Sequence, residues 1–213
     1  MTLPPAGRAA VPAEPPPKGF RHTAFFAPRR VALWADPALP ESALLAHNLL
    51  RGGFRGELRT IGPRWDGFGG VERPEDLSDP PDVTVLALPP EAQEPALAAI
   101  AARGCAAAVV PVAAPGLGPM ARRHGVRAMG ARSFGLALPT LGLNATLSHL
   151  PLRPGRLALL CQSSALARAV IDWAVAEDLG FSAVCGIGAN DDYGFAGALD
   201  WLAGDATTGA VLL

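Results

Sequence analysis

Short apolar runs alternate with longer amphipathic segments along most of the chain, beginning near residue 25. The short runs have the length of buried strands, and the longer segments have the length and end signals of helices. This alternation is typical of β-α-β units built around a parallel sheet. The predicted elements are strands over 31–35, 57–61, 83–88, 107–112 and 127–130, and helices over 41–51, 91–103 and 116–124.

A second α/β unit is predicted after a loop-like stretch near 131–154. Its expected elements are strand 156–161, helix 164–178, strand 182–187, helix 195–203 and strand 209–213. The last of these runs has the composition of a buried strand, but no helix follows to cover it. A self-contained sheet is not expected to end in this way. The pattern therefore favours a fragment, or a subunit whose remainder lies elsewhere.

Residues 1–24 differ in composition from everything that follows. They are rich in Pro, with scattered Ala and Gly, and such a segment buries too little apolar surface to order itself. We expect a disordered leader over 1–24. Order is expected to begin at the aromatic pair Phe25 and Phe26.

Charge and cysteine usage exclude several classes of function. With 18 basic and 19 acidic residues the formal net charge is −1, so no global field attracts nucleic acid or an anionic membrane. Cys105, Cys161 and Cys185 are widely spaced within apolar runs, which indicates buried thiols rather than disulfides or metal ligands. The sequence shows neither a membrane-span pattern nor a signal peptide pattern, and a cytoplasmic location is expected.

Candidate chemistry lies in the turns, because an open parallel sheet binds ligands beyond the carboxyl ends of its strands. The turn over 34–40, which includes Trp34 and Asp36, contains no glycine. It is either a phosphate site or a plain surface turn. Ser163 or Ser164 could cap a helix or hold a phosphoryl group. The turn over 186–192 combines glycines with two acids, which suit either a solvated loop or the surroundings of a metal-bound phosphate.

Other familiar sites are not visible in the sequence. There is no G-x-G-x-x-G and no P-loop motif. His22, His47, His124 and His149 are scattered, and neither a nucleophilic triad nor a metal-ligand spacing emerges from them. No metal site is predicted.

Phe26-Ala27-Pro28-Arg29-Arg30-Val31 leads into the first predicted strand, and Gln162-Ser163 follows a P-G-x-L-A-L run. These and other segments, in colinear order from about residue 25 to 213, resemble the ADP-forming acetate-CoA ligases, which are NDP-forming acyl-CoA synthetases of the succinyl-CoA synthetase superfamily and begin with a similar F-x-P-R-S-V segment. The matching segments are 26–33, 48–56, 81–83 with 87–90, 141–145 continuing to His149, 154–159 with 162–163, 172–174, 180–182 and 199–203.

The resemblance implies an α/β fold with two parts. A Rossmann-like, parallel-sheet CoA-binding domain is expected over 25–150, and a truncated flavodoxin-like domain over 151–213. The implied CoA positions are Ala35, Asp36, Pro63, Leu88, Pro89, Pro90, Gly130 and Arg132. The implied phosphate-facing positions are Gln162, Ser163, Ser164 and Gly188.

The resemblance also implies an activity that this chain does not complete. The family makes acyl-CoA and a nucleoside triphosphate from acyl phosphate, CoA and the diphosphate, through a phosphorylated histidine expected beyond residue 213. The catalytic residues of this chain are therefore unknown. CoA or acyl-CoA is the implied ligand, whereas ADP or ATP and Mg are expected only with a missing ligase or ATP-grasp segment or subunit. Neither a nucleic acid nor a membrane is an expected partner.

Departures from the family's turns leave two functions open. Trp34-Ala35-Asp36 stands for Gly-Ala-Ser, Ala131-Arg132 for Pro-Asn, and Ser164 and Ala189 for Gly and Asn. The first hypothesis is the CoA-binding part of an acyl-CoA ligase, inactive alone. The second is a non-catalytic CoA-sensing or regulatory module of a protein acetyltransferase. A dinucleotide-binding oxidoreductase is disfavoured, because no glycine fingerprint occurs with an acid at the required strand end.

Overall fold

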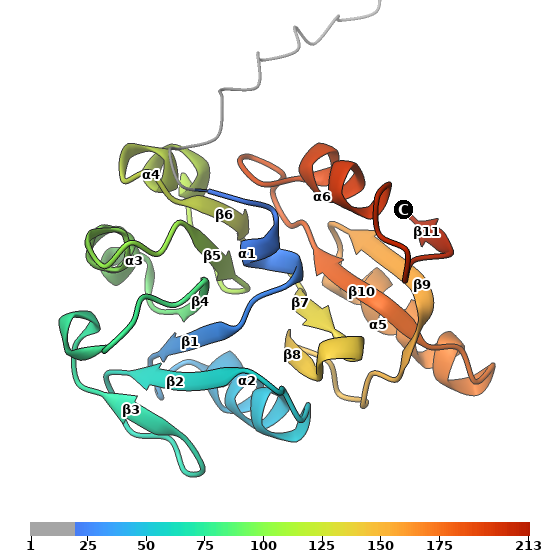
Figure 1. The fold of residues 1–213 in the computed structure, drawn as a ribbon, viewed down its shortest axis with the longest axis horizontal. Helices are drawn as coiled ribbons and strands as arrows, with labels where there is room; N and C mark the ends of the chain where they lie inside the picture. Colours follow the sequence, from blue (N-terminus) through green and yellow to red (C-terminus); the bar gives the residue numbers. More distant parts are fainter. Residues whose placement is uncertain (1–19) are drawn as a thin grey trace, which may run out of the picture.

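A computed structural model describes residues 20–213 of the chain. It contains two sheets side by side, with the short helix α1 (Thr23–Phe26) between them (Figure 1). The first sheet is parallel throughout and has the order β3-β2-β1-β4-β5-β6. This is the Rossmann strand order. From β1 the chain adds β2 and β3 on one side, and then returns to add β4, β5 and β6 on the other side, so the order reverses between β1 and β4.

The elements of the first sheet confirm the predicted alternation to within two residues at each end. One short strand, β3, was not predicted, because a three-residue Gly-Gly-Val run carries no strand pattern. The strands are β1 (Arg30–Ala35), β2 (Glu57–Ile61), β3 (Gly69–Val71), β4 (Val83–Ala87), β5 (Ala107–Val110) and β6 (Arg127–Gly130), and the helices are α2 (Pro40–Arg51), η1 (Pro74–Asp76), α3 (Pro90–Ala102) and α4 (Leu117–Arg123).

The second sheet is mixed and has the order β11-β9-β10-β7-β8. Strands β9 (Pro154–Cys161), β10 (Phe181–Gly186) and β11 (Ala210–Leu212) are parallel, as expected for the second α/β unit. Strand β7 (Gly135–Leu138) pairs antiparallel with β10 and with β8 (Leu143–Thr146). Helix α5 (Ser164–Ala176) and helix α6 (Phe195–Leu202) complete this unit.

The expectation of a loop near 131–154 was wrong. Strands β7 and β8 form a hairpin in this stretch, joined by the 3-10 turn η2 (Pro139–Leu141) and by Gly142 in a left-handed conformation. The strands are too short for the alternation to be recognised, and their apolar residues gain a partner only when β10 lies alongside. The second sheet thus recruits residues 135–146, which precede the predicted division at residue 150.

The structure is ordered slightly upstream of the predicted start. Residues 20–24, which were expected to belong to the leader, include the first turn of α1 and an aromatic residue, Phe20, that packs against Tyr193 with ring centroids 5.6 Å apart. This packing against a distant residue is the reason the segment is ordered. The remainder of the predicted leader lies outside the described residues.

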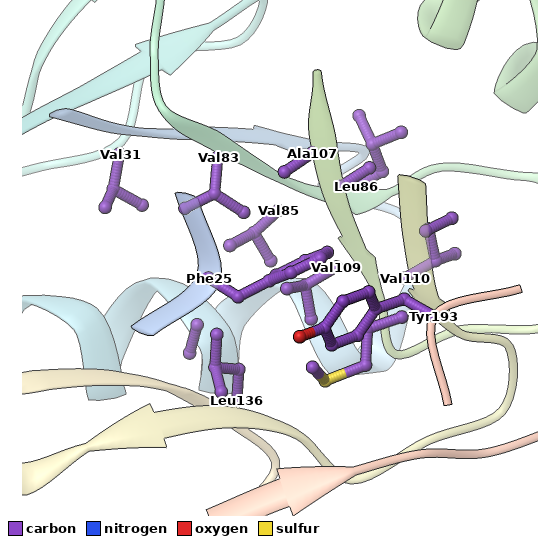
Figure 2. Packing of buried hydrophobic residues seen from close by; sticks show 14 of the residues in the cluster. Phe25, Val31, Val83, Val85, Leu86, Ala107, Val109, Val110, Leu136 and Tyr193 are labelled. Carbon is purple, nitrogen blue, oxygen red and sulfur yellow. The ribbon is translucent and has the colours of Figure 1, made fainter. Parts of the chain in front are cut away.

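The core of the molecule is shared by the two sheets. Phe25 from α1 packs on Tyr193, with ring centroids 4.5 Å apart, between Val85 and Val109 of the first sheet and Leu136 of the second (Figure 2). One continuous cluster of buried side chains therefore joins both sheets. Within the described residues, no helix is long and apolar enough to cross a membrane.

Candidate functional site

The turns after β1 and β4 meet at the carboxyl edge of the first sheet, where the strand order reverses. Ala35 lies opposite Ala87 in the parallel register, and the Asp36 backbone N–H donates to the Ala87 carbonyl at 2.8 Å. Asp36 therefore lies beside Leu88, so the sheet brings these predicted CoA positions together. A crevice at such a switch point is where doubly wound sheets bind ligands.

The helices that start at this edge offer little to a phosphate group. Both α2 and α3 have proline at their first position, which removes one of the backbone N–H groups that would otherwise be free. Glu41 and Glu91 occupy the first turns of these helices. The Asp36 carboxylate accepts from the Ala38 N–H at 2.9 Å and so closes its own turn. Three acids therefore lie around this end of the sheet.

Trp34 fills the space beside the end of β2. A Cβ atom placed on Gly62 would lie 3.4 Å from the indole Nε1, and Gly62 has φ of +82°. Trp34 is half-buried and packs against two clusters of buried side chains. Pro63, another predicted CoA position, follows Gly62 directly. The Trp34 indole therefore lies beside one of the turns of the predicted CoA site.

Gly130 and Arg132 form the turn after β6. Gly130 lies opposite Val110, and a Cβ on Gly130 would lie 2.2 Å from the Val110 carbonyl oxygen, so only glycine allows this approach. Arg132 adopts φ of +50°, and its backbone N–H donates to the Val112 carbonyl at 2.8 Å. The Arg132 side chain is exposed at the sheet edge and supplies a cation there.

The predicted phosphate-facing residues follow the strands of the second sheet. The Ser163 hydroxyl accepts from the Leu166 N–H at 3.2 Å, which confirms that Ser163 caps α5. Ser164 is the first residue of that helix. The Gln162 side-chain amide donates to the Gly188 carbonyl at 3.0 Å and so ties the turn after β9 to the turn after β10.

The two groups of predicted positions adjoin at one point. A Cβ on Gly188 would lie 2.2 Å from the Ala131 carbonyl oxygen, so the turn after β10 lies directly against the turn after β6. Gln162 and Gly188 are thereby brought to Gly130 and Arg132. The Ala35 and Leu88 turns lie farther off, since β5 and β6 follow β4 in the sheet at about 4.8 Å per strand.

Gln93 is a residue at this edge that the sequence did not reveal. Its side chain is fully buried, and its Nε2 donates to the carbonyls of Leu88 at 2.9 Å and Ala113 at 2.8 Å. Gln93 therefore holds the turn after β4 to the turn after β5. A lone polar residue on the otherwise apolar inward face of α3 was the available signal, but its partners could not be identified without the fold.

Asp192, one of the two acids of the turn over 186–192, has a different role from either interpretation of the sequence. The Asp192 carboxylate is 1% exposed, lies 3.1 Å from Arg127 Nε and 3.3 Å from Arg122 Nη1, and accepts from the Ala128 N–H at 2.6 Å. Burial raises its pKa, whereas the Ala128 N–H and the two guanidinium groups act in the opposite direction. Asp192 is thus neither solvated nor free to face a metal, but joins its loop to β6 and α4.

The histidines remain apart in space. His22 Nδ1 lies 2.7 Å from the Tyr193 hydroxyl, and His149 Nε2 lies 2.9 Å from the Asp172 carboxylate. His124 is 3.4 Å from Glu94 on the neighbouring helix α3. Within residues 20–213, no group of three or more His, Cys, Asp or Glu side chains could hold a metal ion.

The comparisons with known proteins identify relatives of this fold. Residues 154–213 match the model of the succinyl-CoA ligase-like flavodoxin domain. The chain is 27% identical over 216 residues to the alpha subunit of acetate–CoA ligase [ADP-forming] I from Pyrococcus furiosus, covering 89% of this chain and 46% of that protein. A 94-residue match to acetate–CoA ligase [ADP-forming] I of Archaeoglobus fulgidus is 33% identical and covers 44% of this chain and 14% of that one.

Solved structures give the same result. The apo form of dinucleotide-forming acetyl-coenzyme A synthetase 1 from Ca. Korarchaeum cryptofilum superposes with a TM-score of 0.81 at 26% identity, covering 87% of this chain and 44% of that one. That synthetase is also known in complex with phosphate and ADP. Fold and matches together show that the chain is similar to ADP-forming acetate–CoA ligases, and that residues 154–213 resemble the succinyl-CoA ligase-like flavodoxin domain. The chain spans less than half the length of these relatives.

Proposed function

We propose that this chain is the CoA-binding part of an NDP-forming acyl-CoA synthetase of the acetate–CoA ligase type. The observation that carries the proposal is the contact between Gly188 and Ala131, which unites the phosphate-facing turns with Gly130 and Arg132 at one edge. A ligand with several phosphates and a long arm, such as CoA, could span from Arg132 toward the strand-order reversal at Asp36. The Rossmann order of the sheet supports the same placement.

The remaining chemistry of the reaction belongs, in this proposal, to segments outside the chain. The phosphorylated histidine, the ADP or ATP site and its Mg would come from a ligase or ATP-grasp segment or subunit. The chain alone would then bind CoA but form no acyl-CoA. Among its own residues, Arg132 would attract phosphate oxygens, and Ser163 and Ser164 would present the start of α5 to a phosphoryl group.

Calorimetric titration of the chain with CoA, with NAD as the control ligand, tests the proposal. CoA is expected to bind at micromolar concentration and NAD not to bind. Arg132→Gln should weaken CoA binding about tenfold, because it removes a charge-assisted contact. Asp36→Asn should strengthen it about threefold, since the amide keeps the acceptor for the Ala38 N–H while the negative charge is lost.

The matched control is Arg55→Gln, because Arg55 is an exposed arginine between α2 and β2, at the opposite end of the strands. This variant should bind CoA as the unaltered chain does. Absence of heat with CoA, or equal affinities for CoA and NAD, would contradict the proposed site. So would a loss in Arg55→Gln that matched the loss in Arg132→Gln.

The crowded turn at Trp34 favours a second candidate function, a non-catalytic CoA-sensing module of a protein acetyltransferase. Trp34 and Asp36 place a large indole and an acid where the resembled family has small residues, and Glu41 and Glu91 add negative charge. The two functions differ in a coupled assay with acetate, ATP and CoA. Acyl-CoA formation after addition of the missing ligase segment supports the ligase part, and binding without turnover supports the sensor.

A further inference from the structure

A cavity of about 370 Å³ lies away from the carboxyl edge, between the second half of α2, the start of β8 and the segment 148–152. It has the volume of a small-molecule site. One part of its wall is apolar and includes Leu44, Leu143 and Leu152. The other part is polar and comes from α2 and β8, so the cavity offers a ligand two chemically different walls.

Two buried amides form the polar wall. Asn48 and Asn144 are 7% and 8% exposed, and both hold the backbone at Thr146. Asn48 Nδ2 donates to the carbonyl of Thr146 at 2.8 Å and to that of Ser148 at 2.9 Å. Asn144 Oδ1 accepts from the Thr146 N–H at 3.3 Å and from its hydroxyl at 2.6 Å. These bonds fix which atom of each amide is nitrogen and which is oxygen.

The other half of each amide has no hydrogen-bond partner among the described residues. Asn48 Oδ1 remains an acceptor and Asn144 Nδ2 remains a donor, and both residues line the cavity. Both side chains are more than nine-tenths buried, and neither of these two atoms is sealed off from solvent. An unused donor and an unused acceptor on the wall of one cavity are therefore polar groups that a bound ligand could pair with.

A positive charge lies beside these amides. Arg51 lies one helical turn after His47 on α2, and both line the cavity. The structure gives neither side chain an ion pair or hydrogen bond within residues 20–213. His149, on the facing segment, is held by Asp172 at 2.9 Å. The free charge near the amides is therefore that of Arg51.

We propose that this cavity binds a small organic carboxylate with an apolar body and a hydroxyl group. The carboxylate accepts from Asn144 Nδ2 and Arg51, the hydroxyl donates to Asn48 Oδ1, and the apolar body lies against the leucine wall. This site uses none of the predicted CoA or phosphate-facing residues. It is therefore independent of the proposed function.

Titration with mandelate, followed by amide chemical shifts, tests the site. We expect saturable binding with Kd of about 1 mM or lower, and shifts at Gly52 and Gly142, which line the cavity. Arg51→Gln and Asn144→Asp should each weaken binding at least about tenfold. Asn144→Asp keeps the oxygen that Thr146 requires and exchanges only the donor for a negative charge. Arg64→Gln, an exposed arginine outside the cavity, should bind as the unaltered chain does.

Two comparison ligands separate the contributions of the walls. Phenylacetate, which lacks the hydroxyl, and inorganic phosphate, which lacks the apolar body, should both bind more weakly than mandelate. Equal affinity for phosphate and mandelate would overturn the proposal, because it would mean that charge alone is recognised. Absence of saturable binding, or an Asn144→Asp variant that binds mandelate normally, would also overturn it. CoA titration of the same variants should be unchanged, so failure here is distinct from failure of the proposed function.

Discussion

Cys161 lies at the end of β9 and is 3% exposed. Burial raises the pKa of its thiol to about 11, and burial also raises the pKa values of Cys105 and Cys185. All three cysteines are free and buried, as their apolar sequence context predicts. Because the thiolate is the reactive form, none of them is suited to nucleophilic or redox chemistry in the folded chain.

Thiol labelling measures this protection. At pH 8 the folded chain should react with a soluble disulfide reagent at least about 100-fold more slowly than the unfolded chain, in which three thiols become available. The raised pKa values also predict that stability falls above about pH 9, because the unfolded state releases thiol protons there while the folded state retains them. Fast labelling of one thiol in the native chain would disprove its burial.

Residues whose partners are distant in sequence could not be predicted individually. The cysteines were predictable because a short apolar run alone indicates burial. The roles of Gln93 and Asp192 were not predictable. Gln93 acts through its bond to Ala113 and Asp192 through its contact with Arg127, and only the fold brings these partners together. The same limit applies to Asn48 and Asn144, which nothing in the sequence relates to each other.

Among the elements, α5 begins as the sequence predicts, with a serine cap. Ser163→Ala should lower the free energy of unfolding by about 1 kcal/mol, because the Leu166 N–H loses its acceptor. Urea unfolding followed by circular dichroism measures the change. Ser164→Ala is the matched control and should change stability by less than about 0.5 kcal/mol, since Ser164 is already inside the helix. Equal losses in the two variants would rule out the cap.

The turn after β10 depends on the absence of a side chain at Gly188. Its φ is +62°, and an added Cβ would lie 2.2 Å from the Ala131 carbonyl oxygen. Gly188→Ala should therefore cost about 2 kcal/mol or more and separate the turn from the end of β6. Gly204→Ala is the control, because its nearest neighbour would be 3.7 Å away. Thermal unfolding of both variants measures the difference, and indistinguishable midpoints would contradict the close contact.

At the scale of elements, the sequence predicted the α/β alternation well and the hairpin badly. Long amphipathic helices such as α3 carry their own start and stop signals, including Pro90 and the glycine after Arg103. Strands β7 and β8 carry no such signals, and their place is decided by pairing with β10. The division of the chain into two sheets is consequently a tertiary property.

In the whole molecule, two of the sets of contacts that hold the second sheet to the first come from one loop. The aromatic cluster around Tyr193 packs between the sheets, and burial raises the pKa of the Tyr193 hydroxyl, which donates to the Gly197 carbonyl at 2.9 Å. The Asp192 carboxylate joins the same loop to β6 and α4. Because these contacts share one loop, we expect the two sheets to unfold together.

Asp192→Asn tests how much the ionic contact contributes to this union. The substitution keeps the size of the side chain but leaves Arg127, whose side chain is 17% exposed, without its counter-charge. A loss of about 1 to 2 kcal/mol is expected, because the substitution removes charge-assisted contacts to Arg122 and Arg127 and leaves the partly buried Arg127 guanidinium without its counter-charge. Asp200→Asn is the control, since the Asp200 carboxylate is 80% exposed and lies 3.8 Å from His22, and its loss should be below about 0.5 kcal/mol. Unfolding monitored separately by tryptophan fluorescence and by circular dichroism should give one midpoint in the unaltered chain and a lower one in Asp192→Asn. Equal losses in the two variants would mean that the ionic contact of Asp192 contributes no more than an exposed ion pair.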